Sequence, residues 1–89
     1  MLIHGDSLED DSHLQCDAAI IGAGPAGIVI TLELAAAGLD VILIESGGLE
    51  YSDNNQKLAD AASFDPEFHA PMSECTRRII GGASTIWGG

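Results

Sequence analysis

Residues 18–27, with the sequence Ala-Ala-Ile-Ile-Gly-Ala-Gly-Pro-Ala-Gly, decide the fold of this 89-residue chain. The apolar run 18–21 is bounded by Asp17 and Gly22, which is typical of a strand buried on both faces of a parallel sheet. Residues 25–37 predict a buried helix, because they are mostly apolar, begin with proline and are followed by glycine. The β-branched run 41–44 predicts a second interior strand. Strand, helix and strand in this order form a right-handed parallel crossover unit.

Residues 22–27 fit the pattern G-x-G-x-x-G at the junction of the first strand and the helix. Gly22 permits a tight turn, Gly24 lets a phosphate approach the backbone, and Gly27 lets the helix pack closely on the strand. Backbone N–H groups and the helix dipole favour a pyrophosphate at this place. Pro25 donates no N–H and presets φ. Because glycine-rich turns are common, the pattern alone also fits a purely structural loop.

Glu45 closes the second strand eighteen residues after Gly27. This is near the roughly 20-residue spacing at which a carboxylate meets the ribose hydroxyls of an adenosine. A carboxylate also repels a 2′-phosphate, which disfavours NADP. The plain alternative for Glu45 is a solvated strand end. Together the two motifs predict a dinucleotide-binding unit, and these residues leave the choice between FAD and NAD open.

The glycine-rich stretch 77–89 holds two of the three cationic side chains of the chain, Arg77 and Arg78. Adjacent arginines beside small residues and hydroxyls favour an anion site. As an alternative, both arginines pair with surface carboxylates such as Glu74, and Trp87 is a core or interface aromatic. This stretch is therefore a second candidate region for cofactor binding.

The polar stretch between these motifs carries weaker signals. Residues 54–62 predict a short helix with Leu58 and Ala62 facing inward, and residues 64–72, which contain two prolines, predict a loop. Two parallel strands and one helix leave one face and both edges of a sheet uncovered, whereas a dinucleotide domain usually has about five or six strands. We therefore expect an incomplete parallel sheet and a truncated domain.

The composition excludes several classes of protein. Three Lys+Arg against fourteen Asp+Glu give a formal charge of −11, which disfavours nucleic acids and anionic lipid surfaces as partners. The acidic start lacks the features of an export signal, and the longest uncharged run is too short for a membrane span. Cys16 and Cys75 suggest neither a disulfide framework nor a metal site. We expect a soluble, cytoplasmic protein.

Three motifs together resemble the N-terminus of a glucose-methanol-choline (GMC) oxidoreductase. They are Asp17-x-x-Ile-Ile-Gly-Ala-Gly-Pro-Ala-Gly, then Ile44-Glu45-Ser46-Gly47-Gly48, and then residues 78–89, Arg-Ile-Ile-Gly-Gly-Ala-Ser-Thr-Ile-Trp-Gly-Gly. The resemblance covers 17–89 and leaves only the acidic lead, 1–16, outside. It implies a Rossmann-like α/β unit that binds FAD rather than NAD. Some similar sugar oxidases carry a flavin-bonded histidine where this chain has Ile86, so non-covalent FAD is expected.

The resemblance also implies the cofactor-binding residues. It assigns the FAD pyrophosphate to the first glycine loop, the adenosine ribose to the end of the second strand, and the path toward the flavin ring to the last glycine segment. The expected site residues are Gly22, Gly24, Pro25, Ala26, Gly27, Glu45, Ser46, Arg78, Gly81, Gly82, Ala83 and Ser84. Thr31, where the family usually has alanine, is expected to bond back to its helix.

The activity that the resemblance implies is oxidation of an alcohol or sugar CH–OH group, with hydride passing to the flavin. The family's substrate domain and catalytic bases belong to a part that these 89 residues do not include. None of His4, His13 and His69 is nominated as a catalytic residue. The chain alone is therefore expected to be inactive. The alternatives are a stand-alone dinucleotide-binding module and a non-functional fragment or acidic interaction protein.

Overall fold

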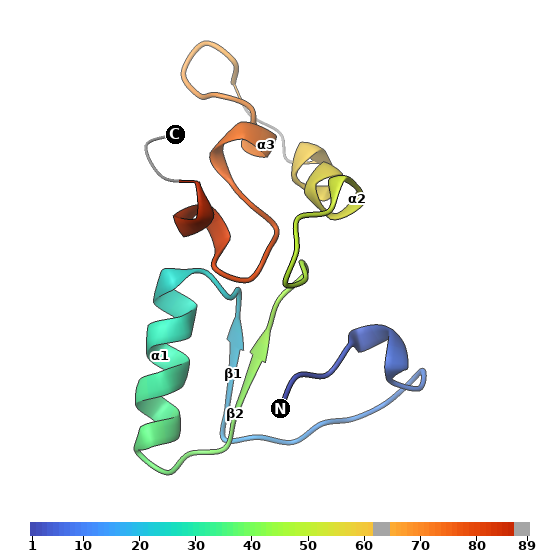
Figure 1. Cartoon of the computed structure of the whole chain (residues 1–89), viewed down its shortest axis with the longest axis vertical. Helices are drawn as coiled ribbons and strands as arrows, with labels where there is room; N and C mark the ends of the chain where they lie inside the picture. Colours follow the sequence, from blue (N-terminus) through green and yellow to red (C-terminus); the bar gives the residue numbers. More distant parts are fainter. Residues whose placement is uncertain (62–64, 87–89) are drawn as a thin grey trace.

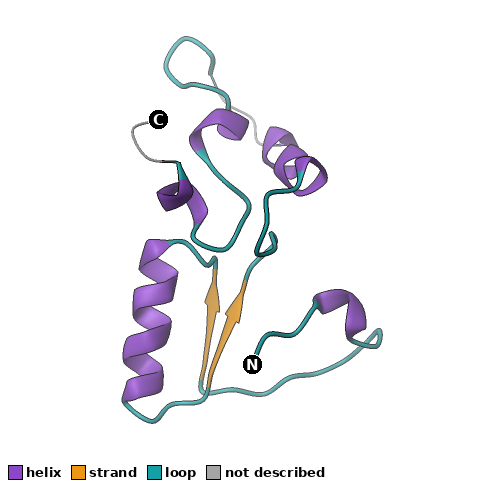
Figure 2. Ribbon diagram, viewed as in Figure 1, coloured by secondary structure: helices purple, strands orange, loops and turns teal. Residues whose placement is uncertain are grey.

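The computed structural model describes residues 1–61 and 65–86, and its centre is one parallel crossover unit. Strand β1 (Ala18–Ile21) leads into helix α1 (Pro25–Ala36), which returns to strand β2 (Val41–Ile44). The two strands pair in parallel, with Ala18 opposite Val41 and Ile21 opposite Ile44. Figure 1 shows α1 running alongside the strand pair, and Figure 2 shows these two arrows as the sheet of the described chain. The predicted strand, helix and strand are confirmed, as an incomplete Rossmann-like α/β unit.

Short hydrogen bonds fix both ends of the crossover. Asp17 and Asp40 bond to each other where the strands begin: the Asp17 N–H donates to the Asp40 carbonyl, and the Asp40 N–H donates to Asp17 Oδ2, each at 2.8 Å. At the end of α1, the Gly38 N–H donates to Ala35 and the Leu39 N–H donates to Leu34. This is the Schellman arrangement, which satisfies the last helix carbonyls and reverses the chain. The helix therefore ends at the place that Gly38 predicts from the sequence.

Only one face of the strand pair is covered in the described part of the chain. Ile20 faces α1, because a side-chain carbon placed on Gly27 would lie 3.5 Å from its Cγ2 atom. Ile21 points the other way and is 85 % exposed, and on α1 the side chains of Val29 and Leu32 are exposed as well. The predictions of a fully buried strand and a buried helix are therefore wrong here. Two strands give the helix contacts along one stripe only.

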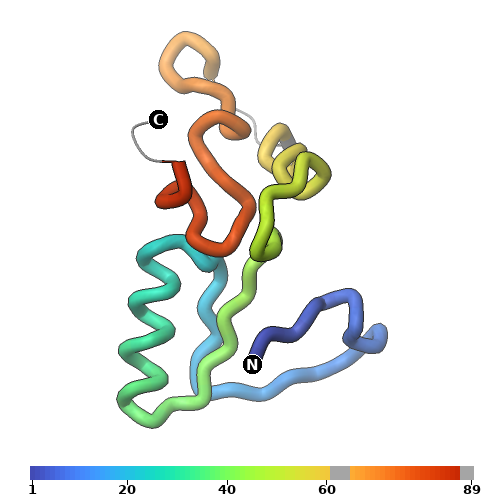
Figure 3. The backbone as a smooth tube through the Cα atoms, in the orientation of Figure 1, coloured from blue at the N-terminus to red at the C-terminus, as the bar shows by residue number. Residues whose placement is uncertain are grey.

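Beyond β2 the chain forms a second layer of short turns. Helix α2 (Asp53–Gln56) continues into the 3₁₀ turn η2 (Lys57–Ala61), and helix α3 (Met72–Cys75) and the 3₁₀ turn η3 (Gly82–Thr85) follow. The tube in Figure 3 shows the red segment returning to the ends of both strands after the orange loop. Ser52 caps α2 by accepting the Asn55 N–H at 3.4 Å. The last glycine segment is thus brought back to the first.

The predicted helix at 54–62 is confirmed up to residue 61, as α2 and η2, but the prediction that Leu58 faces inward is wrong. Leu58 is 55 % exposed, whereas Gln56 and Ala59 are buried at 6 % and 7 %. The tight 3₁₀ turn, with about three residues per turn, changes which positions face the neighbouring segment. Residues 65–71 form the predicted loop, although Met72 already begins α3. Ala62, Phe64 and Trp87 lie outside the described residues.

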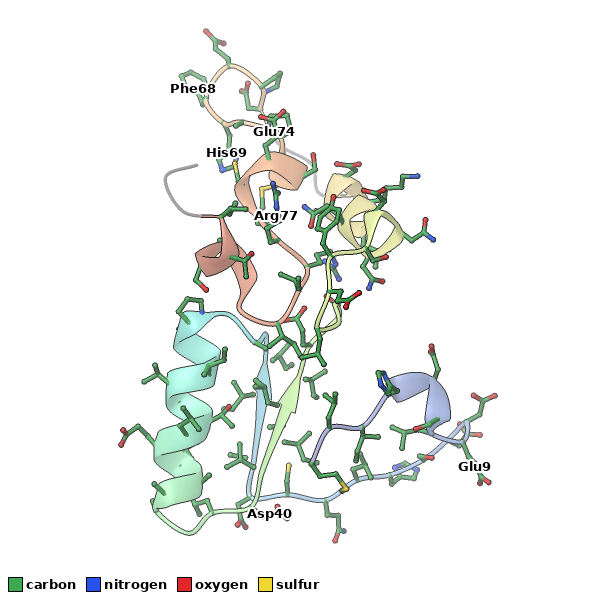
Figure 4. All side chains as sticks on the ribbon, in the orientation of Figure 1. Glu9, Asp40, Phe68, His69, Glu74 and Arg77 are labelled. Atoms are coloured by element: carbon green, nitrogen blue, oxygen red, sulfur yellow. The ribbon has the colours of Figure 1, made fainter. Side chains whose placement is uncertain are left out.

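The acidic lead, residues 1–16, passes the side of the strand pair remote from α1 and contains the 3₁₀ turn η1 (Gly5–Ser7). Figure 4 shows Glu9 at the tip of this segment, away from Asp40 at the base of the strands. Within the described ranges, no helix is long and apolar enough to cross a membrane.

Candidate functional site

The first glycine loop joins β1 to α1 in a conformation that fits the predicted roles of its glycines. Gly22 has φ of +100°, a value that side chains disfavour, and its N–H donates to the Ile44 carbonyl at 2.8 Å. A side-chain carbon at Gly27 would lie 1.9 Å from the carbonyl oxygen of Gly22, so only glycine permits this helix-to-loop approach. Gly24 differs from Gly27, because a side-chain carbon there would meet no atom within 4 Å, and it differs from Gly22 in its ordinary φ of −78°. The space in front of Gly24 is therefore open to a ligand.

Glu45 joins this loop to the turn after β2. Its Oε2 atom accepts the Ala23 N–H at 2.8 Å, and its Oε1 atom accepts the Gly47 N–H at 2.8 Å and the Ser46 hydroxyl at 3.2 Å. Burial raises the pKa of Glu45, but the hydrogen bonds from Gly47, Ala23 and Ser46 outweigh it and leave the pKa below its ordinary value. The carboxylate stays ionised, and Oε2 keeps acceptor capacity for a further hydroxyl.

The last glycine segment packs on both earlier loops through its backbone. A side-chain carbon at Gly47 would lie 1.9 Å from the Arg78 carbonyl oxygen, and one at Gly82 would lie 3.1 Å from the Cα atom of Gly24. Two main-chain hydrogen bonds continue this contact, from Ile80 to Gly48 at 3.0 Å and from Gly81 to Ala23 at 2.7 Å. Three stretches that are far apart in sequence thus meet at the carboxyl ends of the strands (Figure 3). This is where parallel α/β sheets bind ligands.

A cavity of about 310 Å³ opens beside Glu45, between the end of β2 and the second layer. Its walls combine polar groups with apolar side chains: Glu45, Ser46, Leu58, Ala59, Met72, Thr76, Arg77 and Arg78. Arg78 contributes an unusual group, because its Nε atom is buried and has no hydrogen-bond partner among the described residues. A buried donor without an acceptor costs roughly 1 to 3 kcal/mol, so a ligand that supplies one is favoured here.

The two neighbouring arginines have different surroundings. Arg77 donates through Nη1 to the carbonyls of Ser73 at 2.9 Å and Thr76 at 3.0 Å, so it braces the backbone at the end of α3. Figure 4 shows Arg77 beside α3. Arg78 lines the cavity and has its main chain against Gly47. Of the pair, only Arg78 combines a place at the cavity with an unpaired buried donor.

The other predicted site residues gather around the same junction. Pro25 and Ala26 are exposed at the first turn of α1. Ala83 and Ser84 are exposed in η3, where the Ser84 hydroxyl donates to the Gly81 carbonyl, within its own turn. The expected back-bond of Thr31 is confirmed: its hydroxyl donates to the Gly27 carbonyl at 2.7 Å. The fold therefore brings the predicted residues to one end of the sheet.

Gln56 is the residue that the sequence analysis missed. It is buried, and its amide bonds to Ser73, Thr76 and Arg78. It stands in the polar run Asp53–Lys57, whose pattern gives no sign of a buried amide, so no local signal identifies it. The residues of 1–61 and 65–86 contain no cluster of three or more metal-ligating side chains, and Cys16 and Cys75 are both free thiols.

The donor set fits a dinucleotide. The open space at Gly24 lies at the N-terminus of α1, where helix N–H groups and the macrodipole favour a phosphate. Glu45 offers an ionised acceptor for ribose hydroxyls, and Arg78 offers an unpaired donor to an oxygen or ring nitrogen. His69 lies with Phe68 on the loop that precedes α3, away from the first glycine loop (Figure 4).

Comparison with known proteins agrees with this geometry. The model of the FAD dependent oxidoreductase family (DAO) matches residues 17–84. An uncharacterized GMC-type oxidoreductase of Sinorhizobium fredii is 41 % identical over 58 residues, which are 65 % of this chain and 12 % of that protein. A long-chain-alcohol oxidase of Arabidopsis thaliana is 32 % identical over an alignment of 90 positions, which covers 97 % of this chain and 12 % of the oxidase. No solved structure matches the chain at a significant level.

The sarcosine oxidase subunit alpha of Rhizobium meliloti is also similar, at 34 % identity over 67 residues, which are 75 % of this chain and 6 % of that subunit. The chain thus spans about an eighth or less of the length of these relatives. The resemblance to the FAD-binding segment of GMC oxidoreductases is confirmed, and FAD is the cofactor of the matched family. The chain belongs to the family of FAD-dependent oxidoreductases.

Proposed function

We propose that this chain is the FAD-binding N-terminal part of a GMC-type oxidoreductase that acts on CH–OH groups of its donors. The observation that carries the proposal is the meeting of three glycine stretches beside an ionised Glu45 and the unpaired Nε of Arg78. The similarity to a GMC-type oxidoreductase and to a long-chain-alcohol oxidase supports the class of reaction.

In this proposal each stretch holds a different part of FAD. Gly22, Gly24 and Gly27, with Pro25 and Ala26 in the first helical turn, hold the pyrophosphate. Glu45 accepts hydrogen bonds from the adenosine ribose, and Ser46 and Arg78 line the adjoining cavity. The segment 81–84 passes along the pyrophosphate toward the flavin ring. Because Ile86 cannot bond covalently to a flavin, FAD is held non-covalently.

The reaction that the bound cofactor supplies is acceptance of a hydride from the donor carbon. The donor also loses its hydroxyl proton, and an alcohol thereby becomes a carbonyl compound. No residue of this chain is assigned to take that proton, since His4, His13 and His69 are exposed and match no family motif. The role of the 89 residues is to bind and orient FAD, and the substrate domain and catalytic bases are contributed by sequence outside them.

Two measurements test this function together. Titration with FAD, NAD and AMP, followed by flavin fluorescence and by calorimetry, is expected to give saturable binding with FAD as the tightest ligand. A turnover assay with primary alcohols, sugars and choline plus an artificial electron acceptor is expected to give no activity from the 89 residues alone. Clear turnover would disprove the proposal that catalysis needs sequence outside these residues, and preference for NAD would disprove the cofactor assignment.

The proposal includes a reducing, cytoplasmic location, which the two free thiols support.

A further inference from the structure

We propose that Gln56 is a positioning residue for the cofactor: its amide places the Arg78 guanidinium and the glycine segment that follows it. This inference rests on the proposed FAD site and deepens it by identifying what holds one side of that site in place. Gln56 itself does not line the cavity beside Glu45. It acts indirectly, through its hydrogen bond with the backbone of Arg78.

The Gln56 side chain is 6 % exposed and makes three hydrogen bonds to a distant stretch of the chain. Its Nε2 atom donates to the carbonyls of Ser73 and Thr76, both at 2.9 Å, and its Oε1 atom accepts the Arg78 N–H at 3.0 Å. These partners allow one amide orientation only, because a flipped amide would set its oxygen against two carbonyls and its NH₂ against an N–H. A buried amide with this many partners fixes the geometry of what it binds.

Arg78 transmits this placement to the site in two directions. Its carbonyl oxygen packs against the Cα atom of Gly47, so the Arg78 peptide cannot shift toward β2. Arg78 also lines the cavity beside Glu45, and its Nε atom is buried and without a partner in the described part of the chain. The next residues bond to Gly48 and Ala23, which closes the segment onto both glycine loops. The position of the Arg78 backbone therefore affects both the wall of the cavity and the contact with the two glycine loops.

Because Arg77 shares two of the hydrogen-bond partners of Gln56, the effect of Gln56 on Arg78 can be tested without unfolding the segment. Its Nη1 atom donates to the same two carbonyls, Ser73 at 2.9 Å and Thr76 at 3.0 Å. When the Gln56 amide is removed, these carbonyls keep a charged donor. The Arg78 N–H alone loses its partner. We therefore expect the segment from Ser73 to Arg78 to stay folded, while the backbone at Arg78 is held less firmly.

The matched variants are Gln56→Met, which keeps the length of the side chain without its hydrogen bonds, and Asn54→Met, an exposed position of the same short helix. The first readout needs no cofactor: exchange of the Arg78 Nε–H proton with solvent, measured by NMR. We expect slow exchange in the parent protein and in Asn54→Met, and exchange at least about tenfold faster in Gln56→Met. Equal protection in all three proteins would overturn the inference whether or not FAD binds.

The second readout is FAD affinity in a double-mutant cycle of Gln56→Met and Arg78→Ala, with circular dichroism melts as a check on folding. Gln56→Met is expected to raise the Kd for FAD about tenfold, equivalent to roughly 1.4 kcal/mol. In the Arg78→Ala background it is expected to add less than about threefold, because the group it positions is gone. Fully additive effects would overturn the inference. No FAD binding by the parent protein would instead disprove the proposed function and leave the exchange result to decide this inference.

Gln56→Glu is a second variant in case the Met variant fails to fold. It keeps an oxygen for the Arg78 N–H and places a carboxylate beside the Arg77 guanidinium. We expect slower Nε–H exchange than in Gln56→Met. Exchange as fast as that of a free arginine side chain, in a protein that still melts cooperatively, would count against the inference.

Discussion

Glu45 Oε2 accepts the main-chain N–H of Ala23 at 2.8 Å, across 22 positions of sequence. The carboxylate that is proposed to hold the ribose therefore also holds the first glycine loop in place. Its second oxygen does the same for the turn at Gly47. One side chain thus links the ends of β1 and β2, so the shape of the phosphate loop and the place of the adenosine are set together.

This dual role predicts an acid-dependent loss of stability. The hydrogen bonds hold the pKa of Glu45 below its ordinary value, which is about 4.3 for a free glutamate. The stabilisation is therefore fully present above that value and is lost as the pH falls through the lower pKa of the folded state. Glu45→Gln is expected to melt at a lower temperature than the parent at pH 6, with a smaller difference at pH 3.

Melting curves at several pH values between 3 and 7 check this prediction, with the exposed Glu50→Gln variant as the control. Glu50→Gln is expected to follow the parent curve at each pH. A gap between Glu45→Gln and the parent that stays constant down to pH 3 would show that the ionisation of Glu45 does not contribute to the stability of the loop.

The first glycine loop predicts losses of different size for two glycine-to-alanine changes. At Gly27 the new carbon would collide with the Gly22 carbonyl oxygen, and such overpacking costs about 1 to 3 kcal/mol of unfolding free energy. At Gly24 the carbon would meet open space and the backbone has ordinary angles, so Gly24→Ala is expected to lose less than about 1 kcal/mol. Chemical denaturation measures both, and equal losses would contradict the geometry.

The contact of Gly47 with Arg78 predicts that the packing of the second layer requires a glycine at position 47. Gly47→Ala would place a carbon on the Arg78 carbonyl oxygen and is expected to cost about 1 to 3 kcal/mol. Gly48→Ala is the matched control, since a side-chain carbon there would meet only Glu50 backbone atoms, at 4.0 Å. Denaturant titrations of the two variants give the comparison. A Gly48→Ala loss as large as that of Gly47→Ala would rule out the specific contact.

The fold is predictable from sequence where the cause is local. The apolar runs on either side of the helix, Pro25 at its start and Gly38 at its end give β1, α1 and β2 almost to the residue. Thr31 is also local, because its hydroxyl bonds to the carbonyl four residues earlier. The glycine pattern adds its own constraint, since Gly27 must be small for α1 to meet the loop.

What could not be predicted depends on contacts between distant segments. Gly47 matches a family motif, but nothing near it in sequence indicates that Arg78 packs on it. Gln56 stands in a polar run and is nevertheless buried, because its partners begin seventeen residues later. Leu58 has the side chain of a core residue and is exposed, because the 3₁₀ turn places Ala59 inward instead. Each error has the same origin: the short second layer is shaped by the segment that returns to it.

The most direct test of the central claim is a calorimetric titration of the protein with FAD, carried out in parallel on Gly24→Ala. The account predicts saturable binding of one FAD per chain and at least a tenfold weaker Kd in Gly24→Ala, about 1.4 kcal/mol or more, with the melting curve of the variant nearly unchanged. Equal FAD affinity in the two proteins, or no saturable binding by a parent protein that melts cooperatively, would contradict it.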